Sequence, residues 1–116
     1  MLKIPYMPIC FMLLTALFSA IGQIFFKYGS DYVGSSIFSW IFNYYLIIGL
    51  MIHAVGFYFM ISAFKQANLS LIYPVLATSY IWVAIFSSIL LKEKIQFIQW
   101  FGMMAIVAGI FMILKK

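Results

Sequence analysis

The chain has 116 residues, of which 67% are apolar and only 8% are charged, whereas soluble domains carry roughly 25% charged residues. This composition, with a mean hydropathy of +1.15, excludes an ordinary soluble domain and indicates a membrane protein. The net charge of +5 does not indicate nucleic-acid binding, because the basic residues are lysines scattered along the chain rather than gathered in a stripe. A disulfide within the chain is excluded because Cys10 is the single cysteine.

The intervals between ionisable residues predict four membrane-spanning helices. Residues 4–26, 66–91 and 95–114 carry no charge, and residues 32–64 are interrupted only by His53. A helix needs about 20 apolar residues to cross a hydrocarbon core about 30 Å thick, so each interval holds one crossing. Strands of a membrane barrel would instead alternate apolar and polar residues. We therefore predict an all-α membrane protein, a single domain over residues 1–116, with short loops between helices at about 8–27, 37–64, 69–91 and 95–114.

The lysines are almost evenly divided between the two ends of the predicted helices, with four on the side of the termini and three on the other. Under the positive-inside rule, this small excess places the termini in the cytoplasm. An even division is also what a chain inserting in both orientations would show, and such dual topology would permit an antiparallel dimer. The two groups are Lys3, Lys65, Lys115 and Lys116, and Lys27, Lys92 and Lys94.

The first predicted helix carries a polar stripe. Thr15, Ser19, Gly22 and Gln23 follow one another at spacings that place them on one helix face. Such a face either lines a cavity or hydrogen-bonds a neighbouring helix, and the spacing alone leaves both possibilities open. Lys27 lies at the end of this helix, where a lysine either extends its amine to the lipid headgroups or binds an anionic phosphate.

The second predicted helix contains His53 near its middle. A charge at that depth costs about 2.5–3.5 kcal/mol on insertion scales, so we expect a neutral imidazole. A hydrogen bond from this ring to a neighbouring helix is the first interpretation, and a proton relay is the second. Gly49 and Gly56, seven residues apart, are small enough to bring another helix close.

The third predicted helix contains Pro74, whose missing N–H predicts a bend or a loosened turn. Tyr73 and Tyr80 share one face of a regular helix and offer phenolic hydroxyls beside that bend, together with Ser79. Trp82 lies deeper and is a candidate for lining a cavity. The alternative for Tyr73 is an aromatic anchor at the membrane interface.

The fourth predicted helix has small residues on one face, among them Gly102, Ala105 and Gly109. We expect this face to pack against another helix, either within the subunit or in a dimer. The two acids, Asp31 and Glu93, fall in predicted loops, so the predicted spans contain no carboxylate. The sequence has neither metal-ligand spacing nor a phosphate-binding glycine loop nor a Ser/His/Asp set, and we therefore expect no enzyme activity, metal or other cofactor.

Five segments taken together resemble the small four-helix members of the drug/metabolite transporter superfamily, which include EamA-like and small multidrug resistance proteins. The resemblance extends over nearly the whole chain, and it depends on the order and spacing of the segments. They are SAIGQIFFK at 19–27, ANLSLIYPVL at 67–76, YIWV at 80–83, LKEK at 91–94 and QWFG at 99–102.

The resemblance implies transport, and its details favour one branch. In the small multidrug resistance family an essential carboxylate precedes the glycine of the first helix by three residues, and that position here is Ser19. The Gly22-Gln23 step, the Tyr73-Pro74 pair and Trp82 look more like the paired subunits that flip aminoarabinose-linked undecaprenyl phosphate across the bacterial inner membrane. This likeness implies a homodimer, or a heterodimer with a related four-helix subunit, that translocates a lipid-linked sugar in that membrane.

The resemblance and the side-chain chemistry together give a set of candidate substrate-binding residues. Hydroxyls and amides would hydrogen-bond the sugar, and Lys27 would attract the phosphate at the membrane interface. Two alternatives remain, an exporter of small hydrophobic or cationic solutes and a non-transporting accessory subunit of a membrane glycosyltransferase. The candidate residues are Thr15, Ser19, Gln23, Lys27, Tyr73, Ser79, Tyr80 and Trp82, with Pro74 at the bend.

Overall fold

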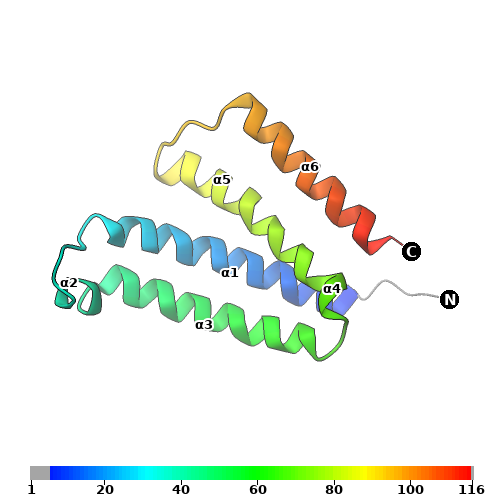
Figure 1. Ribbon diagram of the computed structural model, residues 1–116, viewed down its shortest axis with the longest axis horizontal. Helices are drawn as coiled ribbons and strands as arrows, with labels where there is room; N and C mark the ends of the chain where they lie inside the picture. The colour runs from blue at the N-terminus through cyan, green and yellow to red at the C-terminus, as the bar shows by residue number, and fades with distance from the viewer. Residues whose placement is uncertain (1–5, 116) are drawn as a thin grey trace.

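The computed structural model describes residues 6–115, which form helices joined by short connections (Figure 1). Within that range, four helical stretches are long and apolar enough to cross a membrane. The all-α fold class with four spans is therefore confirmed. The elements in chain order are α1 (Tyr6–Ser30), α2 (Phe38–Ile41), α3 (Tyr44–Phe64), α4 (Leu69–Ile72), the 3₁₀ helix η1 (Tyr73–Thr78), α5 (Ser79–Leu90) and α6 (Phe97–Leu114).

Helices α1 and α3 lie side by side along most of their length (Figure 1). Glycines are buried on both sides of the contact, so the two backbones approach closely, as small residues allow in membrane helix pairs. A methyl group added at Gly49 of α3 would lie 3.1 Å from the carbonyl oxygen of Gly22 of α1. Stacked rings extend the contact, since the centroids of Phe18 and Phe59 are 5.9 Å apart. This pair of helices is the scaffold on which the rest of the chain is built.

The second span begins later than the predicted 37–64. A separate short helix, α2, ends before Asn43, whose extended backbone precedes α3. The Oδ1 atom of Asn43 accepts hydrogen bonds from the N–H groups of Tyr45 and Leu46 at 3.1 and 3.3 Å, and its Nδ2 donates to the Gly29 carbonyl at 2.8 Å. Asn43 therefore caps α3 and ties its start to the end of α1. The prediction of one helix from residue 37 is wrong because the extended backbone at Asn43 separates α2 from α3.

The third span runs from Leu69 to Leu90, close to the predicted 69–91, but its α-helix is interrupted. It consists of α4, η1 and α5, with a 3₁₀ segment from Tyr73 to Thr78. Pro74 lies at the start of that segment, where it has no N–H to donate to the carbonyl four residues earlier. The hydroxyl of Thr78 is the buried side-chain polar atom that lacks a hydrogen-bond partner within residues 6–115. The backbone is thus loosened where the proline predicted a bend.

The connection between α5 and α6 begins with a left-handed residue. Lys92 has a φ of 57°, and the N–H of Glu93 donates to the carbonyl of Ser87 at 3.1 Å. The left-handed residue ends α5, and the hydrogen bond satisfies a carbonyl of its last turn. Helix α6 then begins at Phe97, two residues after the predicted start at 95.

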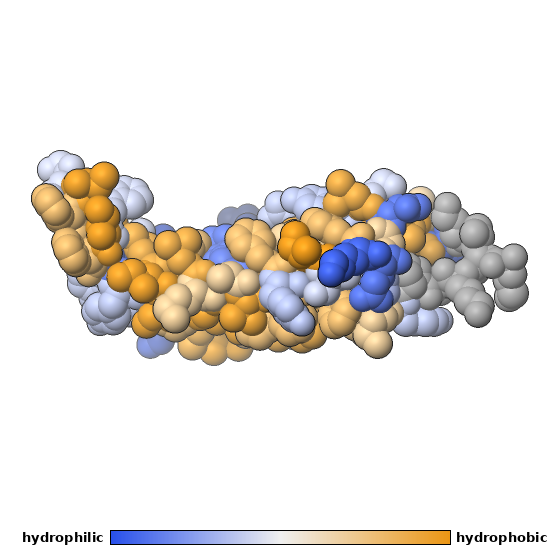
Figure 2. Space-filling view, turned by 90° about the horizontal axis from the view of Figure 1, so that it is seen from below, coloured by the Kyte–Doolittle hydropathy of each residue, from blue (hydrophilic) through white to orange (hydrophobic). Residues whose placement is uncertain are grey.

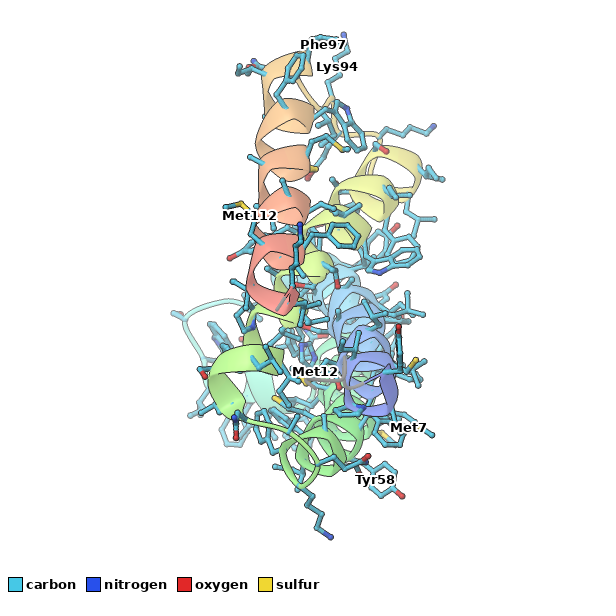
Figure 3. The ribbon with its side chains drawn as sticks, turned by 90° about the vertical axis from the view of Figure 1, so that its right-hand side faces the viewer. Met7, Met12, Tyr58, Lys94, Phe97 and Met112 are labelled. Atoms are coloured by element: carbon cyan, nitrogen blue, oxygen red, sulfur yellow. The ribbon has the colours of Figure 1, made fainter. Side chains whose placement is uncertain are left out.

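The core of the molecule is small. It groups Met12, Ala63, Ile72, Val75 and Ile110 from α1, α3, α4, η1 and α6. Figure 3 shows Met12 inside the bundle, whereas Met7, Tyr58 and Met112 point outward. The face seen in Figure 2 is mostly hydrophobic along its length, and the most hydrophilic residues gather toward one end. An apolar lateral surface of this kind is suited to contact with lipid.

Candidate functional site

A partly open cavity of about 180 Å³ lies between helices α1, α3 and η1. It joins polar side chains from three elements that are far apart in the sequence. Among them are two hydroxyls of α1, the imidazole of α3 and a phenol of η1. The lining residues are Thr15, Ser19, His53, Gly56, Phe57, Met60, Tyr73 and Leu76.

Thr15 is 3% exposed and cross-links the two long helices. Its Oγ1 lies 3.0 Å from the carbonyl of Phe11, one turn earlier on α1, and 3.0 Å from the carbonyl of Gly56 on α3. The single hydroxyl hydrogen is shared between these two acceptors, so this side chain both lines the cavity and holds α1 against α3. Both interpretations of the polar stripe, cavity lining and hydrogen bonding to a neighbouring helix, therefore apply to Thr15.

His53 is held by its own helix. Its Nδ1 lies 2.9 Å from the carbonyl of Gly49, one turn earlier on α3. Because a carbonyl only accepts, Nδ1 carries the hydrogen, and in the neutral ring Nε2 is then the unprotonated nitrogen. The ring stacks on Phe26 of α1 with centroids 4.9 Å apart and planes 6° apart.

The expected hydrogen bond from His53 to a neighbouring helix is therefore wrong. Helix α1 offers the imidazole no acceptor. It offers an aromatic face to stack on and room for the ring. Gly22 provides that space, because a methyl group there would collide with the imidazole ring. Sequence reasoning left His53 out of the binding residues, although it is the ionisable residue that interrupts the apolar interval 32–64.

Ser19 and Tyr73 complete the polar part of the cavity. Ser19 is half-buried and lies one turn after Thr15 on α1, and Tyr73 is 51% exposed at the start of η1. Within residues 6–115 neither hydroxyl makes a hydrogen bond. These two groups are therefore available to a ligand.

The other candidates on α1 lie outside the cavity. Gln23 and Lys27 are exposed side chains and are not among the lining residues. Although Gln23 follows Ser19 by one turn, Gly22 and the His53 ring occupy the helix contact at that level. The structure thus places half of the predicted polar stripe in the cavity.

The candidates on α5 also lie outside this cavity. Tyr80 is 63% exposed, and Trp82 is 37% exposed and stacks on Phe86 at 5.9 Å. Ser79 is half-buried at the start of α5, away from the lining. The prediction that Tyr73 and Tyr80 share a face fails because η1 intervenes between them.

A second hollow, of about 480 Å³, opens as a groove between α5 and α6. Tyr80 and Gly102 are among its lining residues. A methyl group added at Gly102 or at Gly109 would meet nothing within 4 Å, and Ala105 is exposed. Within the described part of the subunit, the two glycines of the predicted packing face of α6 are therefore not in close contact with another helix.

The spans and the cavity define the class of protein. Within residues 6–115, no three His, Cys, Asp or Glu side chains come together as a metal site would require. Four apolar spans make this a multi-pass membrane protein. Three of its helical segments gather polar side chains at one cavity.

The model of the EamA-like transporter family matches residues 35–115, more than two thirds of the chain, and the chain belongs to this family. The protein is therefore a membrane transporter of the drug/metabolite kind, and the resemblance to that superfamily is confirmed. The match includes α2 to α6 and leaves α1 outside. No curated protein and no solved structure is significantly similar to the chain.

Proposed function

We propose that the protein is a subunit of a flippase that carries a polyprenyl-phosphate-linked sugar across the bacterial inner membrane. The observation that carries the proposal is the partly polar cavity within the spans, where the hydroxyls of Ser19 and Tyr73 make no hydrogen bond to any residue from 6 to 115. The tail of a lipid carrier stays in the bilayer while its head crosses. A polar passage between helices is then sufficient, and a membrane carboxylate such as a drug exporter would use is not needed.

The size of the cavity supports action as a dimer. Its volume of about 180 Å³ is the space of roughly six water molecules, whereas pockets for drug-sized ligands measure about 300–1,000 Å³. One chain would therefore hold only part of a sugar phosphate. We propose that a second copy, or a related four-helix subunit, completes the passage by packing on the uncovered α6 face of Gly102, Ala105 and Gly109.

The charge distribution supports an anionic head. The hydroxyl of Tyr28 donates to the carbonyl of Leu90 at 3.4 Å, so the C-terminal ends of α1 and α5 lie together. Lys27, Lys92 and Lys94 are therefore on the same side of the bundle. Each lysine near a membrane surface attracts an anionic headgroup by about 1 kcal/mol. The small lysine excess on the other side supports cytoplasmic termini.

A flipping assay tests the proposal. The purified chain is placed in liposomes containing undecaprenyl phosphate-aminoarabinose, and a membrane-impermeant amine reagent reports which leaflet holds the amino sugar. We expect the protein to expose inner-leaflet substrate to the reagent. Ser19→Leu, which fills the cavity, should abolish this exposure. Ser62→Leu is the matched control, because the Ser62 hydroxyl bonds to Tyr58 of its own helix outside the cavity.

Two results would replace the proposal. If the amino sugar stays protected while the same liposomes accumulate tetraphenylphosphonium against a pH gradient, the protein is an exporter of hydrophobic cations. If neither substrate moves but the chain stimulates a co-reconstituted membrane glycosyltransferase, it is an accessory subunit.

A further inference from the structure

We propose that His53 is the proton-binding site of this transporter, and that its protonated imidazole holds the phosphate of the lipid carrier in the cavity between α1, α3 and η1. The inference rests on the proposed function and adds the energy coupling and the anion contact at the same site. It starts from the position of the ring, which lines the cavity together with Thr15, Ser19 and Tyr73.

The hydrogen bond to Gly49 determines which nitrogen can bind a proton. Nδ1 already carries its hydrogen and donates it to that carbonyl at 2.9 Å. A proton taken from water therefore adds to the lone pair of Nε2, the ring gains one positive charge, and the Nδ1–H bond to Gly49 is kept. The donor is a hydronium ion, whose O–H bond breaks as the Nε2–H bond forms and which leaves as neutral water. The site accepts a proton without rearranging the helix that carries it.

The surroundings offer the charged ring no counter-ion from the described chain. α1 contributes Thr15 and Ser19 to the cavity, and the titratable group that shares the lining with His53 is the phenol of Tyr73 from η1. The acids Asp31 and Glu93 lie in the connections, and Lys27 lies outside the lining. A charge without a partner is costly inside a membrane protein.

An anion that enters the cavity removes this cost. Proton binding and phosphate binding therefore favour each other, and by thermodynamic linkage the effect is reciprocal. The face of Phe26 lies against the imidazole at 4.9 Å, where an aromatic ring attracts a cation. Ser19 and Tyr73 supply further donors for phosphate oxygens.

The single histidine of the sequence makes a direct test possible. In ¹⁵N-histidine-labelled protein freed of any affinity tag, NMR resolves one imidazole and its tautomer. Three probes are compared, which are undecaprenyl phosphate, the neutral alcohol undecaprenol, and inorganic phosphate. We expect an Nδ1–H tautomer at high pH. We also expect undecaprenyl phosphate, but not undecaprenol, to raise the protonated-to-neutral ratio at a given pH about tenfold, within the usual range of coupling between two sites.

An equal effect of inorganic phosphate would show that the free anion suffices and would overturn the lipid-carrier part of the proposal. An imidazole that stays neutral down to pH 5 with saturating undecaprenyl phosphate would overturn the proposal as a whole. So would an Nε2–H tautomer, since Nε2 would then not be the accepting atom.

Transport of the amino-sugar lipid distinguishes this inference from the proposed function. His53→Asn keeps an N–H donor at the position of Nδ1 for the Gly49 carbonyl but never becomes charged, so its flipping rate should be flat between pH 5.5 and 8 while that of the natural protein changes. A natural protein that flips at a pH-independent rate would refute the role of His53 and leave the flippase standing. If the histidine responds to undecaprenyl phosphate but the protein flips nothing, the flippase is refuted and the binding role of His53 is kept.

Discussion

Replacing Gly49 by alanine should force α1 and α3 apart. The added methyl would lie 2.6 and 2.7 Å from two ring carbons of Phe26 and 3.1 Å from the carbonyl oxygen of Gly22. Carbon atoms prefer a separation of about 3.5–4.0 Å, so Phe26 or the whole of α1 must move by roughly 1 Å. Phe26 is not free to move alone because it stacks on His53. Overpacking of this kind costs about 1–3 kcal/mol.

Gly109→Ala is the matched control, since its methyl would meet nothing within 4 Å. Both variants gain the same helix propensity, up to about 1 kcal/mol, so their difference isolates the overpacking. We expect Gly49→Ala to unfold roughly 1–3 kcal/mol more easily than Gly109→Ala. The measurement is an SDS titration in bicelles followed by far-UV circular dichroism. Equal midpoints for the two variants would refute the close contact of α1 with α3.

Three further perturbations test the cap, the cross-link and the interface. Thr15→Val removes the hydrogen bond to Gly56 and should cost about 0.6 kcal/mol, and at most about 1.7, in the same titration; an unchanged midpoint would contradict the cross-link. Asn43→Ala removes the cap of α3 and should cost about 1–2 kcal/mol. Hydrogen exchange should rise in the first turn of α3, and Asn43→Asp, which keeps the acceptor but loses the donor to Gly29, should protect that turn. Gly102→Leu should convert a dimer to monomers in analytical ultracentrifugation without loss of helicity, and a persisting dimer would exclude this face of α6 from the interface.

The four spans were predictable because a charge inside the bilayer is costly whatever the fold, so charge-free intervals mark the crossings without knowledge of contacts. The break at Asn43 was not predictable in this way. Asn43 has an extended backbone and its side chain bonds to Gly29, fourteen residues away, while residues 37–43 are themselves largely apolar. Local composition does not distinguish a short interfacial helix from the start of a span.

The cavity was only partly predictable for a related reason. Thr15 and Ser19 were found because regular spacing on a single uninterrupted helix gives a reliable face. Between Tyr73 and Tyr80 the same arithmetic fails, because each 3₁₀ residue turns the chain by about 120° instead of about 100°. Tyr73 therefore lines the cavity, while Tyr80 lines the groove beside α6. His53 was missed as a site residue because α3 is apolar on all sides and offers no polar face.

The spans differ in length, and this difference acts on the lipid. α1 has 25 residues and α6 has 18, which correspond to about 37 Å and about 27 Å of helix. The longer helix tilts to fit a hydrocarbon layer about 30 Å thick, whereas the shorter one draws the two leaflets together around itself. The bilayer is then thinnest beside α6, along the groove that α6 forms with α5. A second subunit that covers α6 would relieve this mismatch, because association is one way in which a short span is accommodated.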